Sequence, residues 1–88
     1  MIVMDIDNIV AALSDIQEDK RVPRNVRASL QETVGELINN EENITVKLNT
    51  AISILDEVSN DTNIQPFTRT QIWNIVSMLE SLQNEIES

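Results

Sequence analysis

The 88-residue sequence has no cysteine, histidine or tyrosine, one glycine, two prolines, one tryptophan and one phenylalanine. Without cysteine the chain forms no disulfide and no thiolate metal site. The usual general bases, nucleophiles and transition-metal ligands are missing together, and no glycine-rich loop is present to hold a phosphate. We therefore expect no enzymatic activity, no metal site and no cofactor.

Positive charge is also scarce, because six lysines and arginines face fifteen aspartates and glutamates, giving a formal net charge of −9. This balance opposes general affinity for nucleic acid or anionic lipid. The apolar runs are shorter than the roughly 18 residues of a membrane span, and the N-terminal MIVMDIDNIV lacks the basic start of a signal peptide. A cytoplasmic protein without membrane contact is expected.

Apolar residues recur at three- and four-residue steps in four segments, which is typical of amphipathic helices. The scarcity of glycine and proline disfavours a β-rich fold. The predicted helices extend to about Glu18, from the turn at Pro23 to Ile38, from the cap Asn43 to Val58, and from Pro66 to Ile86. The short connections predict an all-α, antiparallel up-and-down four-helix bundle in a single domain, residues 1–88. Gly35, inside the second helix, is expected to mark a close contact with a neighbouring helix.

A shift of 42 residues aligns the first half of the chain with the second. Apolar pairs such as Leu13 with Leu55 fall in register, and the polar pairs are Asp15 with Glu57, Asp19 with Asp61, and Arg27 with Arg69. Two related helical hairpins, about residues 1–40 and 43–88, are therefore predicted. The pattern resembles HEAT-type repeats in its period, in its aspartate at the inter-helix turn, and in Val-Arg-Ala at 26–28. The segment TRT at 68–70 keeps only the arginine of that triplet.

The stretch EDKRVPRNVR, residues 18–27, holds four of the six basic residues. Arg27 shares its place in the repeat with Arg69, so we expect both to be structural, with the stem on the core and the guanidinium reaching Asp19 or Asp61 across the turn. Replacing either arginine by alanine should then cost a similar amount of stability.

The other three basic residues of this stretch have no basic counterpart in the second half: Lys20, Arg21 and Arg24. Two interpretations stay open for these candidate interaction residues. They pair with acids elsewhere, including those of a partner subunit, or they contact a small anion or an RNA backbone. The lack of interleaved aromatic residues makes the nucleic-acid signal weak.

Trp73 lies about 130° from the centre of the apolar stripe of the fourth helix on a helical wheel. It is either a boundary residue packed with Phe67 over a neighbouring loop, or an anchor for a protein partner, since tryptophan is enriched at binding hot spots.

Three segments in order, VPRNVR (22–27), AISILDEVSND (51–61) and RTQIW (69–73), resemble an archaeal family of small proteins of unknown function, uncharacterised protein family 0147. The resemblance spans nearly the whole chain. It departs at Thr62, where the family often has proline, so only the rigidity of that turn is expected to differ from the family. It implies a four-helix bundle from an archaeal cytoplasm, and it supplies no activity and no catalytic residues.

The favoured function is a small non-enzymatic module for protein–protein contact, with a second copy of the chain as one candidate partner. The alternative is an RNA- or ribosome-associated factor that uses residues 20–27. A third interpretation, an acidic surface that imitates nucleic acid, rests on charge alone.

Overall fold

The computed structural model describes residues 2–87, with side chains from Ile6 to Ile86, so both end residues of the predicted domain lie outside the described residues. Over this range the chain forms four helices. They are α1 (Ile2–Gln17), α2 (Arg24–Leu37), α3 (Ile44–Ser59) and α4 (Pro66–Glu87). Each lies within a few residues of its predicted bounds, because the apolar period sets the helix and the turn residues set its ends.

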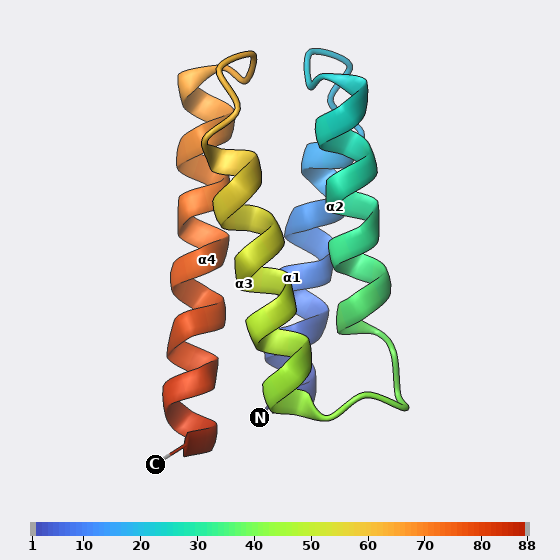
Figure 1. Ribbon diagram of the computed structural model, residues 1–88, viewed down its shortest axis with the longest axis vertical. Coiled ribbons are helices and arrows are strands. Elements are labelled where there is room, and N and C mark those ends of the chain that lie inside the picture. Colours follow the sequence, from blue (N-terminus) through green and yellow to red (C-terminus); the bar gives the residue numbers. More distant parts are fainter. Residues whose placement is uncertain (1, 88) are drawn as a thin grey trace.

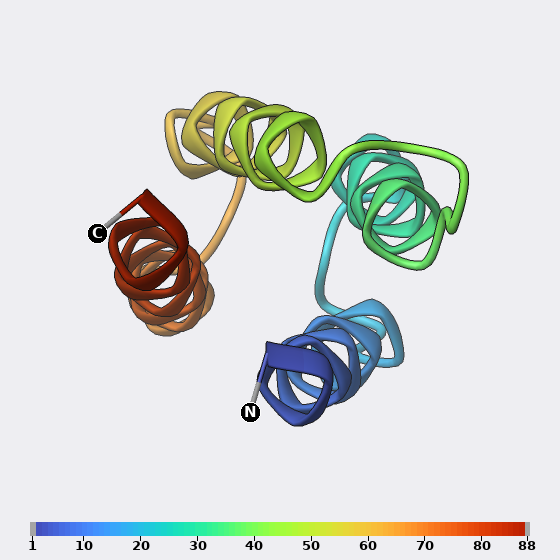
Figure 2. The same cartoon turned by 90° about the horizontal axis from the view of Figure 1, so that it is seen from below.

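The four helices run alternately up and down and form a bundle about 36 Å long (Figure 1). Viewed along the bundle, they follow one another in chain order around a ring (Figure 2). Each helix packs against its two neighbours in that ring, and α4 closes it against α1. The predicted all-α four-helix bundle is confirmed.

The core is aliphatic, as expected for a chain with two aromatic residues. The largest fully buried side chains are Ile9, Leu13, Val26, Leu30, Thr33, Leu37, Leu48, Leu55, Ile72 and Leu79. Thr33 is polar, but its hydroxyl donates to the carbonyl oxygen of Ser29 at 2.8 Å. This hydrogen bond within α2 offsets the cost of burying the hydroxyl.

The three connections between helices are each six residues long and share one local structure. They comprise residues 18–23, 38–43 and 60–65. The second residue of each is Asp19, Asn39 or Asp61, and its side-chain oxygen accepts the backbone N–H two residues later at 2.9, 3.0 and 2.8 Å, respectively. This side-chain turn offers the backbone an alternative to further helix. The ends of α1, α2 and α3 are therefore each followed by the same type of side-chain turn.

The helix starts agree with the expected capping residues. The side-chain oxygen of Asn43 accepts from the N–H of Thr45 at 2.8 Å and caps α3. Pro66 is the first residue of α4, whereas Pro23 stands one place earlier, as the N-cap of α2.

Two expectations for α2 are wrong. Gly35 is exposed, and a Cβ placed on it meets no described atom within 4 Å, so it marks no close helix contact. The helix predicted to end at Ile38 with an apolar residue ends at Leu37, and the side chain of Ile38 is 58% exposed. The residues that α2 buries include Leu30, Thr33 and Leu37.

Candidate interaction surfaces

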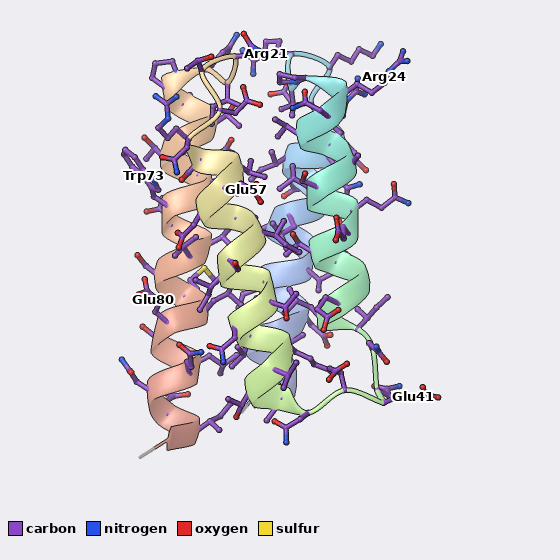
Figure 3. The ribbon with its side chains drawn as sticks, viewed as in Figure 1. Arg21, Arg24, Glu41, Glu57, Trp73 and Glu80 are labelled. Atoms are coloured by element: carbon purple, nitrogen blue, oxygen red, sulfur yellow. The ribbon has the colours of Figure 1, made fainter. Side chains whose placement is uncertain are left out.

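The connections 18–23 and 60–65 lie at the same end of the bundle (Figure 1), which we call the turn end. Arg21 and Arg24 project from this end (Figure 3). Because Lys20 and Arg27 are near them in the chain, four of the six basic residues gather in and beside one connection of an acidic protein.

Arg21 is paired with an acid of its own turn. Its Nε and Nη2 donate to the two carboxylate oxygens of Asp19 at 3.0 and 2.9 Å, and its backbone N–H donates to the first of them. The side-chain bonds from Arg21, followed by its backbone N–H, lower the pKa of Asp19 from 3.8 to about 2. The charge of Arg21 is therefore largely matched within residues 18–23.

Arg69 stabilises the end of α3. Its Nε donates to the carbonyl oxygen of Ser59 at 2.9 Å, and its Nη2 donates to the carbonyl oxygen of Asp61 at 3.0 Å. Carbonyls at a helix C-terminus lack partners within the helix, and an arginine can supply them. Arg69 thus reaches across its turn, as expected, but it binds main-chain oxygens rather than the carboxylate of Asp61.

Arg27 differs from Arg69, although the repeat places them at equivalent positions. It is half-buried, and its Nε is buried without a hydrogen-bond partner among the described residues. The expected pair with Asp19 is not formed, and the carboxylate of Asp19 accepts from Arg21 instead. The second half has Asn63 where the first has Arg21, so this pair has no counterpart there.

A shallow hollow of about 470 Å³ lies beside Arg27, between the end of α1 and the first turns of α2. Its lining residues are Gln17, Arg24, Arg27, Ala28 and Gln31. The two glutamines were not identified from the sequence, since a lone glutamine on a helix surface carries no motif. The hollow brings together two of the basic residues at 20–27 and leaves Lys20 and Arg21 outside its lining.

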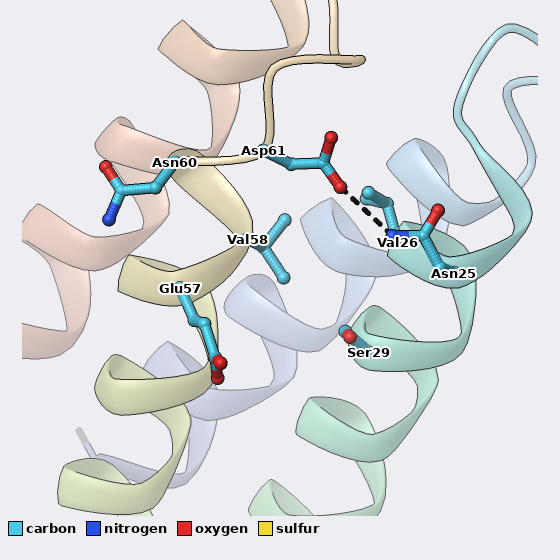
Figure 4. Close-up of a pocket in the computed structure, with 7 residues that line it drawn as sticks. All are labelled: Asn25, Val26, Ser29, Glu57, Val58, Asn60 and Asp61. Carbon is cyan, nitrogen blue, oxygen red and sulfur yellow. Dashed lines mark hydrogen bonds between the residues drawn. The ribbon is translucent and has the colours of Figure 1, made fainter.

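A second hollow, of about 300 Å³, lies between α2 and α3 at the turn end (Figure 4). Across it the side-chain amide of Asn25 donates to the carboxylate of Asp61 at 3.0 Å. The N–H of Asn63, and after it this amide, lower the pKa of Asp61. Asn25 thereby links the first hairpin to the second. This role could not be predicted from the repeat, because the counterpart of Asn25 in the second half is Phe67.

Both aromatic side chains of the chain are exposed on α4. Phe67 is 62% exposed and Trp73 is 54% exposed, and Trp73 points away from the bundle (Figure 3). Neither residue is part of the core. Of the two interpretations of Trp73, a residue packed over a loop and a free anchor, the exposure favours the second.

Within residues 2–87, no group of three or more acidic side chains is placed to hold a metal ion. The helices of the same range are all too short or too polar to cross a membrane.

A family model described as "Uncharacterised protein family (UPF0147)" matches residues 3–82. The chain belongs to the UPF0147 family. The resemblance identified from the sequence is therefore confirmed.

Relatives in the UPF0147 family come from archaea. A UPF0147 protein of Methanothermobacter thermautotrophicus is 50% identical over 81% of this chain and 70% of its own length. UPF0147 protein MJ1419 of Methanocaldococcus jannaschii is 44% identical over 85% of this chain and 81% of its own. A solved structure titled "Crystal structure of unknown function protein MMP1188" is 45% identical, covers 88% of each chain and superposes with a TM-score of 0.83. These names carry no activity, ligand or partner.

Proposed function

We propose that this UPF0147 protein is a small, non-enzymatic helical module that binds another protein through the exposed aromatic residues of α4. The observation that carries the proposal is that its two aromatic side chains are both more than half exposed. A chain of this size gains most per residue by burying such side chains, and this one leaves them in water.

The exposed area is large enough to matter for binding. An aromatic side chain buries about 150–250 Å² when fully covered, so half of Trp73 leaves roughly 100 Å². At about 25 cal/mol per Å², covering it contributes on the order of 2.5 kcal/mol of transfer free energy, before the entropic costs of association are subtracted. This is the size of effect that defines a binding hot spot, where tryptophan is enriched.

The absence of histidine, cysteine and tyrosine from the sequence supports a non-enzymatic role, because it leaves only carboxylates, hydroxyls, two lysines and four arginines for chemistry. The partner is a protein rather than a membrane in this proposal. A second copy of the chain is one candidate for the partner. The mass of a crosslinked adduct distinguishes it from any other protein.

The test places a photo-crosslinking phenylalanine analogue at position 73 and irradiates the protein in archaeal cells. We expect one discrete adduct, whose mass identifies either a second copy of the chain or another protein. The matched control carries the same analogue at Val46, which is also an exposed apolar residue, 44% exposed, but lies in the first turn of α3.

Adducts of the same pattern at both positions, or none at position 73, would contradict the proposal. Once the adduct has identified the partner, Trp73→Ala and Phe67→Ala in the chain without the analogue should each abolish affinity capture of that partner while leaving the far-ultraviolet circular dichroism unchanged. A Val46→Ala variant should still capture it.

A further inference from the structure

We propose that the hollow lined by Arg24 and Arg27 binds the phosphate group of a small phosphomonoester. None of the residues that line this hollow lies on α4, so the inference goes beyond the proposed function. It starts from the contrast between two arginines that the repeat makes equivalent. The guanidinium of Arg69 donates hydrogen bonds to the carbonyl oxygens of Ser59 and Asp61, whereas the Nε of Arg27 has no hydrogen-bond partner in the described structure.

The charges around the hollow are unusual for this protein. Its described lining consists of two arginines, two glutamines and one alanine, and it contains no carboxylate. Four other hollows on the same molecule each include an acid, namely Asp61, Glu85, Asp15 and Asp7, respectively. In a chain with fifteen acidic residues, this hollow is therefore suited to an anion.

Both arginines line the hollow, and they lie three residues apart on α2, a spacing at which residues share a helix face. Both are in or just after the first turn of the helix, where the helix dipole opposes positive charge. Their placement is therefore unfavourable in the free protein. An anion between them removes the repulsion that the two charges impose on each other.

The unpartnered Nε of Arg27 adds a second reason. A buried donor without an acceptor costs stability in the free protein. An oxyanion in the hollow can accept from Nε and one Nη at once, in the two-pronged geometry that guanidinium groups form with phosphate. Because Nε is covered in the free protein, binding requires the guanidinium to turn toward the hollow.

A phosphomonoester fits the charges better than a carboxylate. Two arginines supply two positive charges, and a phosphomonoester carries close to two negative charges at pH 7. The side-chain amides of Gln17 and Gln31 offer further donors to the remaining phosphate oxygens. A carboxylate has a single charge and two oxygens, so it leaves one arginine unmatched.

Arg21 supplies the matched control. It lies in the same connection and has the same charge, but Asp19 occupies its guanidinium at 2.9 and 3.0 Å. Loss of Arg21 changes the net charge as much as loss of Arg24 or Arg27 does. It should nevertheless leave binding in the hollow almost unchanged.

The experiment is a titration of the full chain with inorganic phosphate at pH 7.5, followed by ¹H–¹⁵N spectra that include the arginine Nε–H signals, at constant ionic strength set with sodium chloride. We expect saturable shifts of the Arg27 Nε–H signal and of the first α2 amides. Arg24→Ala and Arg27→Ala should each weaken binding at least tenfold, and Arg21→Ala less than twofold. Acetate at the same ionic strength should cause no saturable shift.

Several outcomes would overturn the inference. They are the absence of saturation, an equal response to acetate, and an Arg27→Ala variant that binds like the wild type. The last part of the experiment is a titration with a short single-stranded RNA that lacks a terminal phosphate. If it shifts the same signals at lower concentration than phosphate, and phosphate does not displace it, the hollow is a nucleic-acid contact and the phosphomonoester assignment is wrong.

Discussion

Arg69→Ala should destabilise the protein far more than Arg27→Ala. Arg69 makes two hydrogen bonds to main-chain oxygens, of Ser59 and Asp61. Hydrogen bonds to a charged group contribute about 1.5–3 kcal/mol each, and water near the half-buried side chain reduces that value. We therefore expect the free energy of unfolding to fall by about 2–3 kcal/mol in this variant.

Arg27→Ala removes a side chain whose Nε is buried and unpartnered among the described residues. Deleting that donor relieves a cost of about 1–3 kcal/mol, while the loss of stem packing costs a comparable amount. The net change should lie within about 1 kcal/mol of zero. The two variants should thus differ by about 2 kcal/mol, rather than being equal as the repeat alone predicts.

Urea unfolding followed by circular dichroism at 222 nm measures this difference. For a domain of this size 1 kcal/mol shifts Tm by about 4–8 °C, so thermal unfolding should separate the two variants by roughly 8–16 °C. Arg69→Lys, which keeps the charge but loses the two-pronged donor, should fall between the wild type and Arg69→Ala. Equal losses in Arg27→Ala and Arg69→Ala would refute the reasoning.

Three further predictions concern single residues. Gly35→Ala should raise the free energy of unfolding by about 0.5–1 kcal/mol in urea, because the site is helical and its Cβ meets open space; a loss would show that the glycine is needed. Asn43→Ala should cost about 1 kcal/mol in the same assay, since it removes the cap of α3, and no change would contradict the cap. The carboxyl of Asp19 should titrate by NMR near pH 2, and Arg21→Ala should move its pKa part of the way back toward 3.8. Because the folded pKa lies below the ordinary one, the contribution of Asp19 to stability is present above about pH 3.8 and is lost as the pH falls toward 2; an Asp19 pKa insensitive to Arg21→Ala would argue against the pair.

The helices and the core could be predicted from the sequence because both follow from one periodic signal. An apolar residue at every third or fourth place fixes a helix and its inner face together. The ends were predictable for a related reason, since Asn43 and Pro66 act through local backbone chemistry that does not depend on the rest of the fold. The family resemblance rested on short segments and was confirmed over residues 3–82.

The partners of the polar side chains at the turn end could not be predicted in the same way. Arg21 and Arg27 both lie within reach of Asp19 along the chain, and only three-dimensional geometry decides that Arg21 takes the carboxylate. Asn25 and Asp61 are far apart in sequence and meet through the packing of α2 against α3. The hollow beside Arg27 is lined by residues of both α1 and α2, so it too depends on how these helices pack.

The ring of helices has a consequence for the order in which the protein opens. Three of its four interfaces join helices that a six-residue connection holds together, whereas α1 and α4 meet only after the whole chain has folded back. Closing that last interface costs the most loop entropy. All four helices lie around the same ring in Figure 2, but they differ in connectivity. Each of α2 and α3 is joined by a connection to both of its neighbours in the ring, whereas α1 and α4 are each joined to one neighbour. Native-state hydrogen exchange should therefore find the slowest amides in α2 and α3, with the seam between α1 and α4 as the first part of the bundle to separate.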